Sequence, residues 1–176
     1  TAILAANAIL MNMQYLLSFA LDGFAHAAES LVGEGFGKKD LRHVDQTIKW
    51  VMIFSAAVAA AFTVLYAVAY PLFIQMMTSL PEVVDVAQSH GLWIVVSPLV
   101  GVWCFGLDGI FIGATQTRAM LWSMVFSAFL YFALATWAAD HWQNHGLWGA
   151  LMVLVAMTEI GIEQFIEHLY QIDELA

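Results

Sequence analysis

Two aspartates stand inside strongly apolar segments, and their side chains are the groups best suited to chemistry in this sequence. Asp22 lies in FALDGFAHAA and Asp108 in FGLDGIFIGA, so each belongs to a Leu-Asp-Gly triplet. An isolated carboxylate in apolar surroundings is costly unless it is paired, hydrated or protonated. Burial favours the protonated form and a nearby cation favours the ionised form, so such a group can exchange a proton for a cation. We therefore expect Asp22 and Asp108 to bind a proton, a sodium ion or a cationic substrate.

Each aspartate belongs to a polar stripe with helical spacing. At about 100° per residue, side chains three and four positions apart share one face of a helix. A polar stripe on an apolar helix faces the protein interior or a water-filled cavity rather than lipid. We therefore expect a polar lumen between two such helices. Its candidate lining residues, besides the aspartates, are Tyr15, Ser18, His26, Glu29, Ser97, Cys104 and Thr115.

A structural role for the acids is the alternative interpretation. An aspartate can accept hydrogen bonds from a free backbone amide or from Ser and Tyr on a neighbouring helix. Glu29 lies nearer the end of its apolar segment, where the structural interpretation is favoured. The sequence predicts no catalytic residue and no metal site, because no Cys pair or His pair inside a span supplies three or four converging ligands. His141 and His145 are spaced four apart beside Trp142, which is typical of interfacial residues.

The composition is that of a membrane protein. Of the 176 residues, 62% are hydrophobic and 11% charged, against about half and about a quarter in soluble domains. The chain has long apolar blocks, and about 20 such residues span a bilayer. We predict an all-α membrane protein with five transmembrane helices, at residues 3–32, 47–73, 86–114, 119–139 and 146–166. The net charge of −9, without a basic patch, does not indicate nucleic-acid binding.

The basic residues predict the orientation in the membrane. Lys38, Lys39, Arg42 and Lys49 flank the first connection and Arg118 lies in the third, whereas the second and fourth connections have no Lys or Arg. Two helices separate the first and third connections, so both lie on one side of the bilayer. By the positive-inside rule that side is cytoplasmic, and the first, third and fifth helices run inward. Pro98 is expected to kink the third helix.

Two segments carry a resemblance to a known family. LDGFAHAAESLVGEGFGKKD and PLVGVWCFGLDGIFIGATQTRAM resemble the eighth and tenth helices of the DinF-like branch of the MATE (multidrug and toxic compound extrusion) transporters. The resemblance extends from Thr1 to about Met157. It implies a fold of twelve helices in two lobes, in which residues 1–176 form a partial carboxy-terminal lobe of helices eight to twelve. The amino-terminal lobe and helix seven would then be missing.

The same resemblance implies a function. It indicates a multi-pass protein of the bacterial inner membrane, not an enzyme, that exports small organic, often cationic compounds in exchange for protons or sodium ions. Its partners would be these substrates, the lipid bilayer and the missing lobe of the same protein, and it would need no cofactor. The family's helix-ten acid, which belongs to a cation site, corresponds to Asp108. Two alternatives stay open: a membrane scaffold or enzyme subunit with structural acids, and an exporter of lipid-linked cargo.

Overall fold

The computed structural model describes residues 2–157, and all regular elements in that range are α-helices. Helix α1 spans Ala2–Gly37, α2 Leu41–Met77, α3 Pro81–Ser89, α4 Gly91–Gly113 and α5 Thr117–Met157. By length and composition, four segments could cross a membrane: α1, α2, α4 and residues 120–157 of α5. An apolar all-helical chain with these lengths confirms the predicted fold class.

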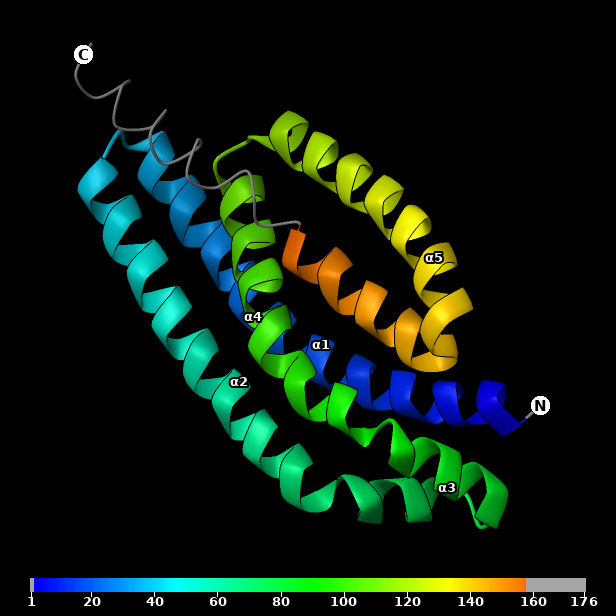
Figure 1. Ribbon diagram of the computed structural model, residues 1–176. Helices are drawn as coiled ribbons and strands as arrows, with labels where there is room; N and C mark the ends of the chain where they lie inside the picture. The colour runs from blue at the N-terminus through cyan, green and yellow to red at the C-terminus, as the bar shows by residue number, and fades with distance from the viewer. Residues whose placement is uncertain (1, 158–176) are drawn as a thin grey trace.

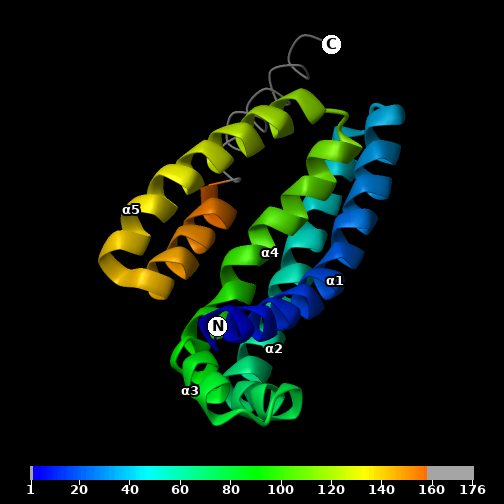
Figure 2. The same cartoon turned by 90° about the vertical axis from the view of Figure 1, so that its right-hand side faces the viewer.

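Helix α4 is the central element. It packs against α1, α2 and α5, and Figure 1 shows it between α2 and the α5 hairpin. The most apolar stretch of α4 has 56% of its residues buried, against 11% for α5. Figure 2 shows α1 and α4 running in the same direction, as predicted from the sequence. Their ends and the two following connections therefore lie at one end of the bundle.

Both helices that carry the aspartates end in the same way. Lys39 after α1 and Thr115 after α4 adopt left-handed backbone conformations, with φ of 57° and 58°. The amide of Asp40 then donates to the carbonyl of Gly35, and that of Gln116 to the carbonyl of Phe111. This five-residue return bond is the Schellman cap, which satisfies carbonyl groups left free at a helix end. At the end of α1 the left-handed position is thus occupied by Lys39 and not by one of the glycines that precede it.

Helix α5 is broken and folds back on itself. Gln143 has φ 51° and ψ −128°, which no α-helical residue adopts, and Figure 1 shows the two halves as a hairpin. A Cβ atom at Gly146 would collide with the carbonyl group of Ala138, so glycine permits the halves to meet next to the turn. The two halves correspond to the fourth and fifth helices predicted from the sequence.

The observed boundaries differ from the predicted ones in two further ways. Helix α1 continues past residue 32 to Gly37 and α2 begins at Leu41, both in polar sequence outside the apolar blocks, and α2 also continues past residue 73 to Met77. The helix predicted at 86–114 is divided at His90 into α3 and α4. Pro98 lies inside α4 without ending it. Residues 158–166, the last part of the fifth predicted helix, lie outside the described residues.

Two apolar clusters form the core at different levels. One, which we call the outer cluster, joins α1, α2, α3, α4 and α5 around residues such as Leu17, Tyr66 and Ile94. The other, the inner cluster, joins α1, α2 and α4 near Val32, Val44 and Phe111 and lies toward the basic connections. In the outer cluster the buried hydroxyl of Tyr66 donates to the carbonyl oxygen of Met13 at 2.7 Å, which ties α2 to α1.

We predict that Gly109→Ala destabilises the fold. The added Cβ would collide with the backbone of Ala25, which cannot move as a side-chain tip could, so a loss of about 1–3 kcal/mol is expected. The measurement is thermal unfolding of the purified protein in detergent. Gly101→Ala is the matched control, because its Cβ would have the Phe105 ring at 3.8 Å as its nearest neighbour. Equal melting temperatures for the two variants would contradict the prediction.

Candidate functional site

Close contact between α1 and α4 positions the two aspartates. Gly109 leaves room for the backbone of Ala25, and a Cβ at Gly113 would lie 2.6 Å from the carbonyl oxygen of Glu29. Gly33 in turn faces the backbone of Gly113. Small residues four apart allow helices in a membrane to approach this closely. The contacts advance along both helices in the same direction, which fixes the register of α1 against α4.

This register brings Asp22 and Asp108 to the same level of the bundle. Asp108 is adjacent to Gly109, and Asp22 lies three residues before Ala25, the contact partner of that glycine. Both side chains are partly buried, and their carboxyl groups are close enough to interact electrostatically. Within residues 2–157, no basic side chain lies within ion-pair distance of either one. When both carboxyl groups are ionised they therefore repel each other, and no basic side chain of the described residues compensates their charge.

The aspartates lie where the two apolar clusters meet. On α1, Leu21 belongs to the outer cluster and Ala28 to the inner one; on α4, Val102 belongs to the outer cluster and Leu107 to the inner one. An ionisable group between two apolar layers can reach water only through a restricted path. This placement is suited to binding a small cation or a proton transiently.

Cys104 is the nearest described polar neighbour of Asp108 on its own helix. Its Sγ atom lies 4.0 Å from Oδ2 of Asp108 and one turn before it on α4. A thiol is a weak hydrogen-bond donor.

The other candidate residues on α1 do not converge on the aspartates as a closed group. Tyr15 is 54% exposed, and Ser18 is partly buried. Nδ1 of His26 lies 3.6 Å from Oε2 of Glu29, and the His26 side chain is 80% exposed. These four side chains form an open polar face along α1.

The remaining two candidates, on the α4 side, differ from each other. Ser97 is buried, and its hydroxyl donates to the carbonyl oxygen of Ile94 at 3.0 Å, so its proton is used within its own helix. Thr115 is exposed in the turn after α4, in the left-handed conformation. The helical wheel placed it on the stripe because the sequence does not reveal that α4 ends at Gly113.

Comparison with known proteins identifies the family. Residues 1–137 match the MatE family, which is more than half of the chain. The chain belongs to the MatE family. The match covers α1 to α4 and most of the first half of α5, including both aspartates and the contact between α1 and α4.

Two curated relatives agree with this assignment. The MatE chain is 38% identical over 160 residues to DNA damage-inducible protein F of Escherichia coli (strain K12), which is 91% of this chain and 35% of that protein. It is 23% identical over 154 residues to Protein DETOXIFICATION 44, chloroplastic, of Arabidopsis thaliana, covering 88% of this chain and 30% of that protein. The chain thus spans about a third of the length of these relatives. No solved structure gives a significant match.

A second group of polar residues in this MatE chain was not recognised from the sequence. The side-chain amides of Asn7 on α1 and Asn144 on α5 donate to each other, at 2.7 and 3.0 Å, and Nε1 of Trp148 also donates to Asn7 at 3.0 Å. Asn7 is the only strongly polar residue in the first ten. Its isolation in an apolar segment is the sequence feature that could have indicated a polar contact there. The network ties α5 to the first turns of α1.

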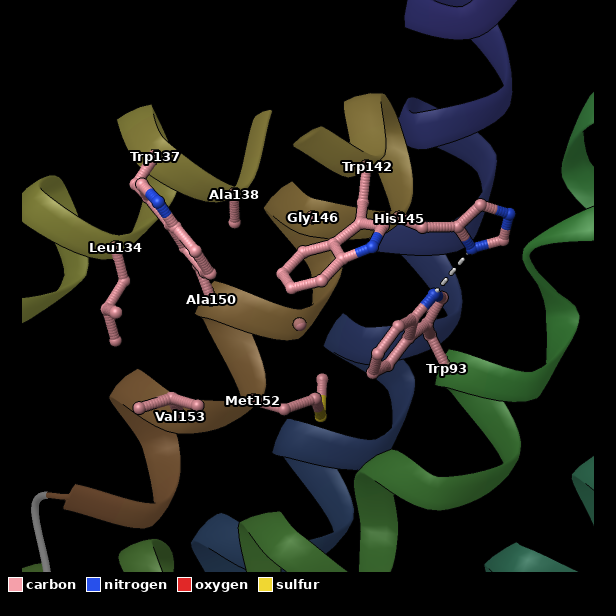
Figure 3. Close-up of a pocket in the computed structure, with 11 residues that line it drawn as sticks. Trp93, Leu134, Trp137, Ala138, Trp142, His145, Gly146, Ala150, Met152 and Val153 are labelled. Carbon is pink, nitrogen blue, oxygen red and sulfur yellow. Dashed lines mark hydrogen bonds between the residues drawn. The ribbon is translucent and has the colours of Figure 1, made fainter. Parts of the chain in front are cut away.

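A largely apolar cavity of about 610 Å³ lies beside that network, between α4 and the two halves of α5 (Figure 3). Trp93, Trp137, Trp142 and His145 line it, together with small and aliphatic residues of α5. Among the described residues, no group of three His, Cys, Asp or Glu side chains could hold a metal ion.

We predict that Asp22 and Asp108 are energetically coupled. Since their carboxyl groups interact, replacing both by Asn should change the free energy of unfolding by an amount that differs from the sum of the single changes by about 0.5–3 kcal/mol. The test is a double-mutant cycle on the full-length MatE protein in detergent. The control cycle pairs Asp108→Asn with Asp45→Asn, because Asp45 is exposed on α2, and it should be additive. Additivity in both cycles would show that the two carboxyl groups do not interact.

Proposed function

We propose that this chain is part of a secondary antiporter that exports small organic compounds, cationic ones among them, in exchange for protons or sodium ions. Members of the MATE family are transporters rather than enzymes, and membership therefore supports this class of activity. The name of the Arabidopsis relative refers to detoxification, which is compatible with export of foreign compounds.

The observation that carries the proposal is the pair Asp22 and Asp108, which has no basic partner among residues 2–157 and lies at the level where the apolar clusters meet. An ion pair would neutralise these carboxyl groups permanently and make them useless for coupling. Without one, each can take up a cation or a proton when the site opens to one side of the membrane and release it on the other. A cationic substrate and the coupling ion then compete for the same negative charge.

Such competition is sufficient for antiport. A substrate released on one side is replaced by the coupling ion, and the carboxyl groups return to the other side neutralised rather than bare. Moving an ionised, unpaired carboxylate through the apolar layers would be unfavourable because it would lose its hydration. The ion bound at Asp108, with Asp22 beside it, therefore permits the return step.

The basic connections and the family support a proposal for the location. Lys38, Lys39 and Arg42 lie in or next to the connection after α1, and Arg118 lies next to the one after α4, at the same end of the bundle (Figure 1). The proposed orientation puts this end in the cytoplasm. We place the protein in a bacterial inner membrane, with an amino-terminal lobe completing the cavity opposite α1 and α4.

We predict that Asp108→Asn abolishes coupled export. The amide cannot ionise, so it can neither hold a cation by charge nor release a proton, and export should fall at least tenfold while expression is unchanged. The measurement is efflux of a fluorescent organic cation from proteoliposomes that hold the full-length transporter, under an imposed proton gradient and, separately, an imposed sodium gradient. The gradient that drives efflux in the wild type identifies the coupling ion.

Asp45→Asn is the control, since this exposed carboxylate on α2 is remote from the site and should leave export intact. Full export by Asp108→Asn would remove Asp108 from the mechanism. Loss of folded protein in Asp108→Asn, without any ion dependence in the wild type, would favour structural acids in a membrane scaffold instead.

A further inference from the structure

We propose that His90, Trp93 and His145 form a pH-sensitive latch, the outer latch, which holds the α5 hairpin against α4 and opens when the imidazole of His145 is protonated. The three residues lie at the end of the bundle opposite to the basic connections, beside the break in α5. This inference uses the proposed orientation but does not depend on Asp22, Asp108 or the identity of the coupling ion.

The hydrogen bond between Trp93 and His145 requires a neutral imidazole. Nε1 of Trp93 lies 3.1 Å from Nδ1 of His145, the contact drawn as a dashed line in Figure 3. An indole N–H can only donate, so Nδ1 of His145 must offer its lone pair. A proton added there would point at the indole proton, and the bond would be lost.

The ring of His90 is hydrogen-bonded through one nitrogen and buried at the other. Its Nδ1 lies 2.8 Å from the carbonyl oxygen of Val86, an acceptor only, and must therefore carry a hydrogen. The neighbouring Ser89 hydroxyl donates to the same oxygen. The other nitrogen of His90, Nε2, is buried without a hydrogen-bond partner. A second proton at Nε2 would create a buried charge with no acceptor, which is costly.

The two imidazole rings are stacked on each other. Their centroids are 4.0 Å apart and their planes differ by 15°. Two neutral rings stack favourably, whereas two imidazolium ions at this distance repel. Burial, together with the charge that His90 would carry, lowers the pKa of His145 in the closed latch. By linkage, lowering the pH through the imidazole range favours the separated state.

No acidic residue compensates these charges. The nearest carboxylates on α3 and α5 belong to Glu82, Asp85 and Asp140, all exposed. Within residues 2–157, none of them lies within ion-pair distance of His90 or His145. The other titratable neighbour on α5 is His141, whose Nδ1 is 2.8 Å from the carbonyl oxygen of Trp137.

The remaining elements around the latch supply no charge either. Helix α2 presents Tyr70, which packs against Gly91. The first turns of α1 and α4, residues 2–15 and 91–104, contain no charged residue. Among the described residues, a protonated latch would therefore have no counter-ion on the elements packed against it.

Opening the latch would change access to the cavity between α4 and α5. Trp93 and His145 both line that cavity, so their separation would widen it at the outer end. In the proposed orientation this end faces the exterior, and the latch would respond to external rather than cytoplasmic acidity. External protons would thus loosen the α5 hairpin independently of the aspartate pair.

The test measures the distance between α4 and α5 as a function of pH. Spin labels are placed at positions 92 and 147, whose leucines are 70% and 39% exposed, in full-length transporter without native cysteines, in lipid nanodiscs. Between about pH 8 and about pH 5, across the imidazole range, the ratio of long to short distances should rise about fivefold or more, equivalent to losing one hydrogen bond of ~1 kcal/mol.

Three variants make the result specific. His145→Gln should stay closed at both pH values, because its amide oxygen still accepts from Trp93 and cannot be protonated. Trp93→Phe removes the donor and should be open at both. His141→Gln is the matched control, an exposed neighbouring histidine, and should respond like the wild type.

Several results would overturn the latch. One is a wild-type distance that does not change with pH. A second is a His145→Gln protein that opens at low pH like the wild type or is already open at high pH. A third is a His141→Gln protein that no longer responds, because the titrating group would then be His141.

Discussion

The close approach of α1 and α4 is the constraint on which the rest of the structure depends. Gly109 and Gly113 present no side chains to the backbone of Ala25 and Glu29, so the two helices meet backbone to backbone. In a membrane, where apolar surface gains little by leaving lipid, such contacts are a main source of helix association. The same contacts set the level of Asp22 against Asp108. The register of α1 against α4 therefore determines both how the helices pack and how the two aspartates are placed.

Polar contacts between the helices are unevenly distributed along the bundle. Asn7 with Asn144, and Trp93 with His145, join α5 to its neighbours near the break in α5. Toward the basic connections the inner cluster is apolar and involves α1, α2 and α4. Helix α5 is thus held by apolar packing in the outer cluster and by directional bonds near its break, whereas the α1–α2–α4 core is packed in both clusters. A change in those bonds moves α5 without disturbing the core.

Much of the architecture could be predicted from the sequence. The apolar blocks predicted the spans, and the number of spans put the first and third connections on one side, which requires α1 and α4 to be parallel, as Figure 2 shows. Such features depend on short stretches of sequence and do not require knowledge of which helices contact each other. The division at His90 was not predicted, because the apolar pattern continues through it.

The site was harder to predict, since it depends on contacts between helices. A helical wheel orients one helix but cannot show which neighbour its face meets, so the pairing of Gly109 with Ala25 was hidden. Nor can it show that a polar side chain such as Ser97 bonds to its own backbone. The link between Asn7 and Asn144 joins residues 137 positions apart, beyond the reach of any periodicity.

The hairpin in α5 has a consequence for how the protein is made. Its tip, residues 140–145, carries Asp140, Gln143, Asn144 and two histidines, and in the proposed orientation all of them cross the bilayer during biosynthesis. The tip contains no Lys or Arg, the residues that most strongly retain a loop in the cytoplasm. In that orientation the two halves can insert into the membrane as one unit with the bend at Gln143. No Lys or Arg in the tip opposes its transfer across the bilayer.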